Sequence, residues 1–426
     1  MHDPFSAVRV ANYRLFAAAF LCSSFSLQMT GMALGWEVYE RTNDPFVLGL
    51  VGVARALPVV ALALPAGHIV DSMRRERVLM VTQAGFGVVL ALIALTTYAF
   101  EAAPATTVGL AAIPKFVWIL LALVSCMGCV RTFNGPSRSS LLPDLVPESV
   151  FQNAVTWNVG LFQFSAVAGP LAAGWMIHRS GHAWGVFAAA AGMCLVSSAL
   201  AAFIRPTRQH VPSAGALTFT GLWDGMGAGL THLRKEKLIL STITLDLFAV
   251  LLGGATALLP VYAKDILHVG PVGLGWLRAS TYLGALAMSL VLAWKPIKRG
   301  AGPMLLASVA LFGGATIVFG LSTSFWLSMA ALLFAGAVDN VSVVIRHILV
   351  QLRTPPHLRG RVSAVNGVFI ECSNELGAFE SGTVAKFFGP VASVVSGGIG
   401  TILVVIGVAA AWKEVRRLDR LEAEAK

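Results

Sequence analysis

The sequence has few charged residues for its length. Only 12% of its 426 residues are Asp, Glu, Lys or Arg, whereas 56% are hydrophobic. An ordinary soluble domain contains roughly 25% charged residues. A soluble protein of this size could bury much of its apolar surface, but it would still need a charged exterior that this composition cannot supply. The composition therefore argues against a large soluble protein and predicts that most of the chain lies in a membrane.

Several kinds of chemical site are also missing. No segment matches the phosphate-binding loop GxxxxGK[ST], so nothing indicates ATP hydrolysis. No His and Cys residues are clustered with metal-ligand spacing, and the CxxC pair Cys126 and Cys129 lies inside an apolar segment without a second pair. We interpret the cysteines as packing residues, and we expect no metal, no cofactor and no enzymatic active site.

Long apolar stretches recur along the whole chain. A helix needs about 20 apolar residues to cross the hydrocarbon core, because lipid offers the backbone no hydrogen-bond partner. The first stretch has no small-residue cleavage site after a short apolar core, so we expect it to be retained. The sequence predicts an all-α membrane protein with twelve spans, at about 13–38, 46–70, 77–100, 115–137, 151–177, 183–204, 238–263, 272–294, 302–321, 325–348, 360–387 and 389–412.

The basic residues are distributed unevenly between the loops. With the N-terminus in the cytoplasm, and with residues at the very ends of spans counted with the adjacent loop, twenty-two Lys and Arg residues fall in the termini and the even-numbered loops, and five fall in the opposite loops. Cytoplasmic loops of membrane proteins are enriched in Lys and Arg. The sequence therefore predicts an inner-membrane protein with both termini in the cytoplasm. The four remaining basic residues lie within predicted spans, away from the span ends, and are Arg55, Arg131, Arg278 and Arg346.

The longest polar break separates the sixth predicted span from the seventh. It covers 205–237 and carries several Pro and Gly residues, a charged run at 234–237 and an apolar stripe of Leu, Phe and Met. We interpret it as an amphipathic linker along the cytoplasmic membrane face. The predicted organisation is a six-helix bundle over 1–204, this linker, a second six-helix bundle over 238–412 and a cytoplasmic tail over 413–426.

The two predicted bundles share a spacing pattern. Six residues in and around spans four and five have an identical residue 208 positions later. Near spans two and eight the offset is 226, where Pro45 and Gly49 match Pro271 and Gly275. Internal repeats are common in multi-span membrane proteins, so the sequence predicts a duplicated six-helix unit in parallel orientation. The pairs at the offset of 208 are Trp118 and Trp326, Gly128 and Gly336, Arg138 and Arg346, Pro147 and Pro355, Gly169 and Gly377, and Gly174 and Gly382.

The loop between spans two and three combines a glycine, a carboxylate and paired basic residues. It reads Gly67-His-Ile-Val-Asp71-Ser-Met-Arg74-Arg75. The glycine permits close backbone approach, and Asp71 can accept a charge-assisted bond from an Arg or a helix N-terminus. The loop resembles the cytoplasmic-loop signature of the major facilitator superfamily, although Arg74 stands where that family usually has Gly. The alternative is that these charges only orient the loop. The candidate residues of a cytoplasmic gate are Gly67, Asp71, Arg74, Arg75, Arg131, Arg138 and Arg361.

Further segments along the chain narrow this resemblance. They read Gly135-Pro-Ser-Arg-Ser-Ser-Leu-Leu-Pro-Asp-Leu-Val-Pro147, Leu245-Asp246-Leu-Phe and Asp339-Asn-Val-Ser342, among others. They are similar to the enterobactin-exporter-like, drug:proton antiporter branch, the transmembrane secretion effectors. The resemblance implies the major facilitator fold, with twelve helices in two pseudo-symmetric six-helix bundles. It also implies proton-coupled export of a siderophore or an amphipathic drug by alternating access, without naming the cargo.

Ionisable residues inside predicted spans are the candidates for proton coupling. A charged side chain at the bilayer centre costs about 2.5–3.5 kcal/mol on insertion scales. Asp339 and Arg346 lie two turns apart on one face of span ten, and Glu371 and Glu375 share a face of span eleven. A proton-coupled carrier needs a shielded carboxyl near an Arg whose distance changes during the cycle. The alternative is a static ion pair. We expect Asp339, Arg346 and Glu375 to act in coupling, with Glu371 and Asp246 as the next candidates.

A second set of polar and aromatic residues could line a substrate cavity. Arg55 enters span two from its outer end and is predicted to meet Glu37, either as a structural pair or in contact with the substrate. Aromatic side chains suit an amphipathic cargo, but they are also common at membrane interfaces. The candidate cavity residues are Glu37, Arg55, Phe162, Phe164, Trp276, Arg278, Asn340 and Phe369.

These observations together predict a monomeric secondary-active exporter whose partners are the lipid bilayer, a small molecule and protons, with no nucleic acid. An importer or facilitator for a metabolite is the alternative within transport. A membrane-embedded enzyme would need a catalytic set at the membrane interface, which the sequence does not show. A sensor would need a signalling domain, and no polar segment is longer than the linker.

Overall fold

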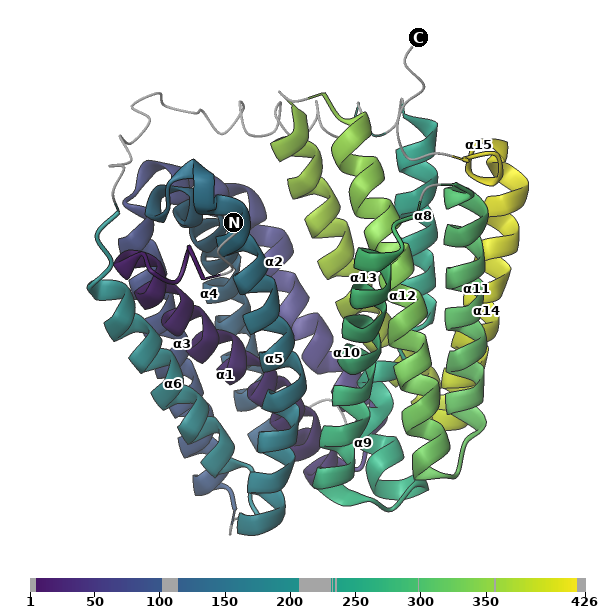
Figure 1. Cartoon of the computed structure of the whole chain (residues 1–426). Helices are drawn as coiled ribbons and strands as arrows, with labels where there is room; N and C mark the ends of the chain where they lie inside the picture. The colour runs from purple at the N-terminus through teal and green to yellow at the C-terminus, as the bar shows by residue number, and fades with distance from the viewer. Residues whose placement is uncertain are drawn as a thin grey trace. The chain divides into compact units, whose positions relative to one another are not determined.

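The computed structural model of the chain describes residues 5–101, 114–206, 231, 233, 236–297, 299–355 and 358–419. These residues form long α-helices joined mostly by short turns (Figure 1). Most of the predicted amphipathic linker lies outside the described residues, as does the end of the predicted tail.

Each predicted span coincides with a helix, except that the seventh corresponds to a helix continued by three short segments. The first six spans are α1 (Ala11–Thr42), α2 (Pro45–Ser72), α3 (Arg75–Ala99), α4 (Lys115–Leu145), α5 (Glu148–Ser180) and α6 (Trp184–Ala202). The seventh is α8 (Lys237–Leu252) with η2 (Ala255–Leu258), α9 (Leu259–Val261) and η3 (Tyr262–Ile266). The last five are α10 (Gly270–Trp294), α11 (Ala301–Leu321), α12 (Phe325–Arg353), α13 (Arg359–Phe388) and α14 (Pro390–Ala411).

The seventh span is interrupted where the sequence predicts one continuous helix. The break falls at Gly253 and Gly254, between α8 and η2. A Cβ atom at Gly254 would lie 2.7 Å from the carbonyl oxygen of Gly377 in α13. Gly254 therefore allows α13 to approach the backbone at the point where regular helical hydrogen bonding stops.

Hydropathy separates α13 from the other spans. Among the described residues, eleven helical segments are long and apolar enough to cross a membrane, and α13 is not among them. At 30 residues α13 is long enough, but it carries Glu371, Glu375 and Glu380, as well as basic residues at both ends. The span that composition identifies least clearly is thus the one that holds the most carboxylates.

The described chain divides into two compact units. Unit 1 comprises Met1–Thr42 and Ala54–Leu217, and unit 2 comprises Asn43–Val53 and Thr218–Lys426. In unit 1, α1 packs on α5 and α6, and α3 packs on α4 and α6. In unit 2, α8 packs on α13 and α14, and α11 packs on α12 and α14. The helix pairs correspond in order along the chain, as expected for a duplicated unit.

Glycine contacts show that the repeat extends to individual residues. A Cβ atom at Gly128 in α4 would lie 2.8 Å from the carbonyl oxygen of Arg55 in α2. A Cβ atom at Gly336 in α12 would lie 2.0 Å from the carbonyl oxygen of Thr281 in α10. The two glycines are related by the offset of 208, and their contact residues are related by the offset of 226. Both sequence offsets therefore describe one helix crossing that occurs once in each unit.

The crossings of α5 and α13 correspond in the same way. A Cβ atom at Gly169 in α5 would lie 2.8 Å from the Cβ atom of Gln28 in α1. A Cβ atom at Gly377 in α13 would lie 2.8 Å from the carbonyl oxygen of Val250 in α8. Small residues let helix backbones approach closely in a membrane, where the hydrophobic effect does not drive helices together. These glycines set the helix spacing on which the candidate site depends.

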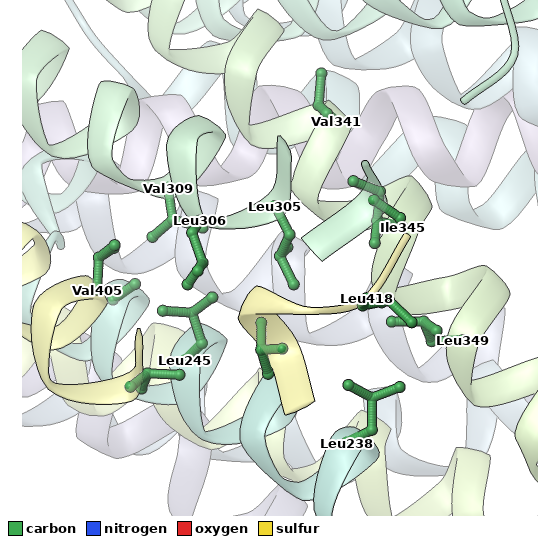
Figure 2. Close-up of a cluster of buried hydrophobic side chains, with 14 residues drawn as sticks. Leu238, Leu245, Leu305, Leu306, Val309, Val341, Ile345, Leu349, Val405 and Leu418 are labelled. Carbon is green, nitrogen blue, oxygen red and sulfur yellow. The ribbon is translucent and has the colours of Figure 1, made fainter. Parts of the chain in front are cut away.

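An apolar cluster at one end of unit 2 includes the segment that follows α14. Figure 2 shows side chains of α8, α11, α12 and α14 gathered around this segment. Within it, α15 (Lys413–Arg416) contributes Val415, which is fully buried, and Leu418 follows. The amide of Gly302 in α11 donates a hydrogen bond of 2.9 Å to the carbonyl of Leu418. The start of the predicted tail is therefore packed onto the bundle.

Candidate functional site

The centre of the candidate site is an ion pair between two membrane-spanning helices of unit 2. Nη1 of Arg346 in α12 contacts Oδ2 of Asp246 in α8, and each side chain is only about a tenth exposed, at 12% and 11%. Nε of Arg346 also donates a hydrogen bond of 3.3 Å to the carbonyl of Ser342, one turn earlier. The guanidinium is thus held through two of its nitrogens, Nη1 by α8 and Nε by its own helix α12.

Asp339 adds a second carboxylate to this site. It is partly buried and lies two turns before Arg346 on α12. The charges of Arg346 and Asp246 both act on it, but among the described residues it makes no direct ion pair. The sequence places Asp339 and Arg346 on one face of this helix, whereas the direct contact of the guanidinium is with Asp246 on α8. The role of Asp339 in coupling stays a prediction.

Asn340, next to Asp339, makes a contact with a neighbouring helix and is partly buried. Its Nδ2 donates a hydrogen bond of 3.0 Å to Oγ of Ser289 in α10. This bond crosses the same helix pair as the Gly336 contact. Asn340 therefore helps to fix α12 against α10, and its predicted role with the substrate is untested.

Two further carboxylates predicted to act in coupling, Glu371 and Glu375, lie on α13. Glu375 is buried, at 8% exposure, and its carbonyl oxygen would lie 2.7 Å from a Cβ atom at Gly52 in α2. Glu371, one turn earlier, is partly buried. Nothing in the described contacts brings either residue into the ion pair of Arg346, so their coupling role remains a prediction.

Glu37 pairs within its own helix. Its carboxylate contacts Arg41, one turn further along α1. The sequence predicts Arg55 in α2 as the partner of Glu37, so this prediction is wrong. Arg41 also donates hydrogen bonds to the carbonyls of Phe100, at 2.8 Å, and Thr97, at 3.1 Å. Its guanidinium lies 4.5 Å above the ring of Phe116 in α4. Glu37 and Arg41 thus join α1, α3 and α4, which is a structural role.

The candidate cytoplasmic gate is described in part. Arg75 at the start of α3 donates to Asp144 in α4 at 2.8 Å and to the carbonyl of Ser140 at 2.9 Å. Arg74 pairs with Glu76 at 2.6 Å. The paired basic residues of the loop therefore hold α3 to the end of α4 and to their own turn. The side chains of Gly67, Asp71 and Arg361 lie outside the described residues.

Arg131 and Arg138, the other two gate candidates, lie two turns apart on α4. The guanidinium of Arg138 lies 4.5 Å above the ring of Phe20 in α1. The positive charge of Arg131 acts on it. Arg138 is thus held by an aromatic face, while the equivalent Arg346 is held by a carboxylate.

Comparison with known proteins identifies the chain. A family model described as transmembrane secretion effector matches residues 2–426. The chain belongs to this family. It is therefore a multi-pass membrane transporter of the major facilitator superfamily and not an enzyme.

Individual relatives of this secretion effector are distant but cover most of its length. A multidrug efflux pump, Tap, of Mycolicibacterium fortuitum is 24% identical over 95% of this chain and 96% of its own. The enterobactin exporter EntS of Shigella boydii is 23% identical over 98% of this chain and 93% of its own. The crystal structure of a D-xylose-proton symporter has a TM-score of 0.70 at 15% identity, covering 95% of this chain and 97% of that one. It shows the shared fold.

Several predicted cavity residues of the secretion effector have surfaces that a ligand or lipid could contact. Phe162 and Phe164 in α5 are 41% and 58% exposed, and Trp276 in α10 is 42% exposed. Phe369 instead packs against a buried apolar cluster, and Arg278 is partly buried. Their roles toward a substrate remain predictions.

Proposed function

We propose that the chain is a secondary-active exporter of a small organic molecule, driven by proton antiport through alternating access in the inner membrane. The family match supports transport. Relatives named as a multidrug efflux pump and an enterobactin exporter support export. They make an amphipathic drug or a siderophore the leading cargo.

The observation that carries proton coupling is the ratio of charges around Arg346. Asp246 and Asp339 supply two carboxylates to one guanidinium. With all three groups ionised, the set holds one net negative charge within membrane-spanning helices, where an uncompensated charge is costly. One proton removes that charge. The set therefore has the composition of a site that binds and releases a single proton.

Asp339 is the proposed proton carrier, because Asp246 already has a direct partner. If Arg346 moved from Asp246 toward Asp339 during the cycle, the guanidinium would displace the proton from Asp339. The return movement would allow Asp339 to bind a proton again. Glu375 and Glu371 are proposed as further members of the proton path, since both lie on a span that composition makes unusually polar.

Transport in proteoliposomes tests this proposal. Three probes share one aromatic body: naphthalene-2-sulfonate, its neutral sulfonamide, and a naphthylmethyl quaternary ammonium. Vesicles with an acidic interior should accumulate at least one probe through the wild-type protein, because protons leaving the interior drive the probe inward. Asp339→Asn should abolish accumulation and retain exchange of probe between equal concentrations.

Glu148→Gln, which changes an exposed carboxylate at the start of α5, is the matched control and should accumulate the probe like wild type. If Asp339→Asn concentrates the probe as well as wild type does, Asp339 is not the proton carrier. If accumulation survives dissipation of the pH gradient, the antiport proposal fails.

We further propose that the Gly67–Asp71 segment at the end of α2, with Arg74, Arg75, Arg131, Arg138 and Arg361, faces the cytoplasm and closes that side. The contacts of Arg75 with the end of α4 support a mechanical role for this region. The same orientation places both termini and the 205–237 linker in the cytoplasm.

A further inference from the structure

Arg138 lies against aromatic rings and is not part of the proposed proton site. It lies on α4, one residue beyond the predicted fourth span, and is partly buried. The Cζ atom of its guanidinium lies over the ring of Phe20, 4.5 Å from the ring centroid. Phe20 in turn stacks on Phe16, with ring centroids 6.4 Å apart and planes tilted by 3°. The two rings form a buried aromatic support for one face of the guanidinium.

The edge of this guanidinium is left available. Among the described residues, no acceptor is hydrogen-bonded to Arg138 and no carboxylate pairs with it, and its side chain is only partly buried. The N–H donors of a guanidinium lie in its plane and point outward from its edge. The charge that acts on it most directly is the like charge of Arg131.

The internal repeat shows how unusual this environment is. Arg138 corresponds to Arg346, which is 208 positions later on the equivalent helix. Arg346 reaches from α12 to α8 and meets Asp246. Arg138 reaches from α4 to the equivalent α1 and meets the ring of Phe20. One half thus neutralises its arginine with its own carboxylate, while the other supplies an aromatic surface and, among its described residues, no anion.

We propose that Arg138, supported by Phe20, binds the anionic group of the transported molecule, and that the cargo class is an amphipathic organic anion. A carboxylate, sulfonate or phosphate would accept two parallel hydrogen bonds from the guanidinium edge. In unit 1 the cargo would then supply the negative charge opposite Arg138, just as Asp246 supplies the negative charge opposite Arg346 in unit 2. This assignment of cargo class rests on the proposed transport function, but binding can be measured without a proton gradient.

Equilibrium binding to the full chain in lipid nanodiscs tests the assignment. Radiolabelled naphthalene-2-sulfonate and its neutral sulfonamide differ in charge and share their aromatic body. The wild type should bind the sulfonate at least about tenfold more tightly than the sulfonamide, as expected for hydrogen bonds to a charged group. Arg138→Gln should remove that preference, and Arg138→Lys should retain part of it because the charge remains without the planar fork.

Phe20→Leu should weaken sulfonate binding by removing the aromatic support. Arg14→Gln, at an exposed arginine on α1, is the matched control and should bind like wild type. Folding is checked by thermal unfolding without probe. Arg138→Gln should unfold no earlier than wild type, since it removes a charge that pairs with no carboxylate in the described part of the chain. A loss of folded protein on this substitution would indicate a structural role for Arg138 and overturn the proposal.

An anionic lipid headgroup presents the same chemistry as the cargo. Nanodiscs of phosphatidylcholine alone are therefore compared with nanodiscs that also contain phosphatidylglycerol. Sulfonate binding that depends on Arg138 in both lipids supports a cargo site. Equal binding of sulfonate and sulfonamide in phosphatidylcholine, or an Arg138 effect confined to phosphatidylglycerol, would overturn it. Failure of proton-driven transport with intact binding would count against antiport and leave the anion site standing.

Discussion

At the scale of single residues, each member of the buried Asp246–Arg346 pair compensates the charge of the other. Removing one partner of a buried ion pair costs about 3–5 kcal/mol, because the remaining charge is left without compensation. Here Asp339 is available as a second carboxylate. Asp246→Asn alone should therefore destabilise the protein less than Asp246→Asn combined with Asp339→Asn. Thermal unfolding in a mild detergent measures both variants.

The third variant in this series adds Arg346→Gln to the two Asp→Asn changes. It leaves no charge at these three positions and should recover most of the lost stability, which is the non-additive behaviour expected of residues in one network. If the combined Asp variants are no less stable than Asp246→Asn alone, Asp339 does not compensate Arg346.

Helical periodicity explains how much of this site could be predicted. The spacing of Asp339 and Arg346 predicts that both lie on one face of α12, and this is the arrangement observed. Periodicity does not show which neighbouring helix supplies a partner across that face. Asp246 is therefore the last of the coupling candidates that the sequence suggests, although it makes the direct contact. For the same reason the sequence predicts Arg55 as the ion-pair partner of Glu37, although the observed partner is Arg41, one turn away on the same helix.

At the scale of helices, the glycine crossings should govern stability. A Cβ atom at Gly336 would lie 2.0 Å from the backbone of Thr281, so Gly336→Ala must push α12 away from α10. Such overpacking costs about 1–3 kcal/mol. A Cβ atom at Gly314 in α11 would meet nothing within 4 Å, and Gly314→Ala should be neutral or stabilise by up to about 1 kcal/mol. Equal unfolding temperatures for the two variants would contradict the tight crossing.

The contact between the start of α2 and α13 contains both an ion pair and a close glycine packing, so their contributions to stability can be compared. Lys386 and Asp44 pair at 2.8 Å, with side chains 43% and 29% exposed. Exposed pairs contribute about 1 kcal/mol or less. A Cβ atom at Gly382 would lie 2.6 Å from the carbonyl oxygen of Pro45. Gly382→Ala should therefore lower the thermal unfolding temperature more than Asp44→Asn does, and the opposite order would show that the ion pair dominates.

The helices themselves are largely predictable, because a membrane-spanning segment must be long, apolar and hydrogen-bonded within itself. The interruption of the seventh span is not. Gly253 and Gly254 belong to an apolar run in the sequence, and the close approach of α13 to Gly254 depends on tertiary packing that the run does not encode locally. The docking of Val415 and Leu418 is also not predictable, since a short segment after the last span has no periodic signal of its own.

At the scale of the whole molecule, the repeat is visible in sequence because glycines at crossings cannot be replaced without moving helices. The repeat also shows where the two halves differ. Arg131 and Asp339 are related by the offset of 208, as are Arg138 and Arg346. One half thus carries two arginines on its fourth helix, while the other carries an acid and an arginine. The proposed anion site and the proposed proton site follow from this difference in charge.

Orientation in the membrane is the last prediction, and it depends on the distribution of Lys and Arg. Twenty-two of these residues fall on one side and five on the other, and such a bias places the richer side in the cytoplasm. Reporter fusions after Arg77, within 205–237 and at the C-terminus should all report cytoplasm, and fusions near Lys115 or Arg179 should report periplasm. Reversal of all five signals would move the proposed gate to the outer face. A periplasmic signal from the 205–237 fusion alone would mean that an odd number of spans precedes the linker, which is incompatible with two parallel six-helix units.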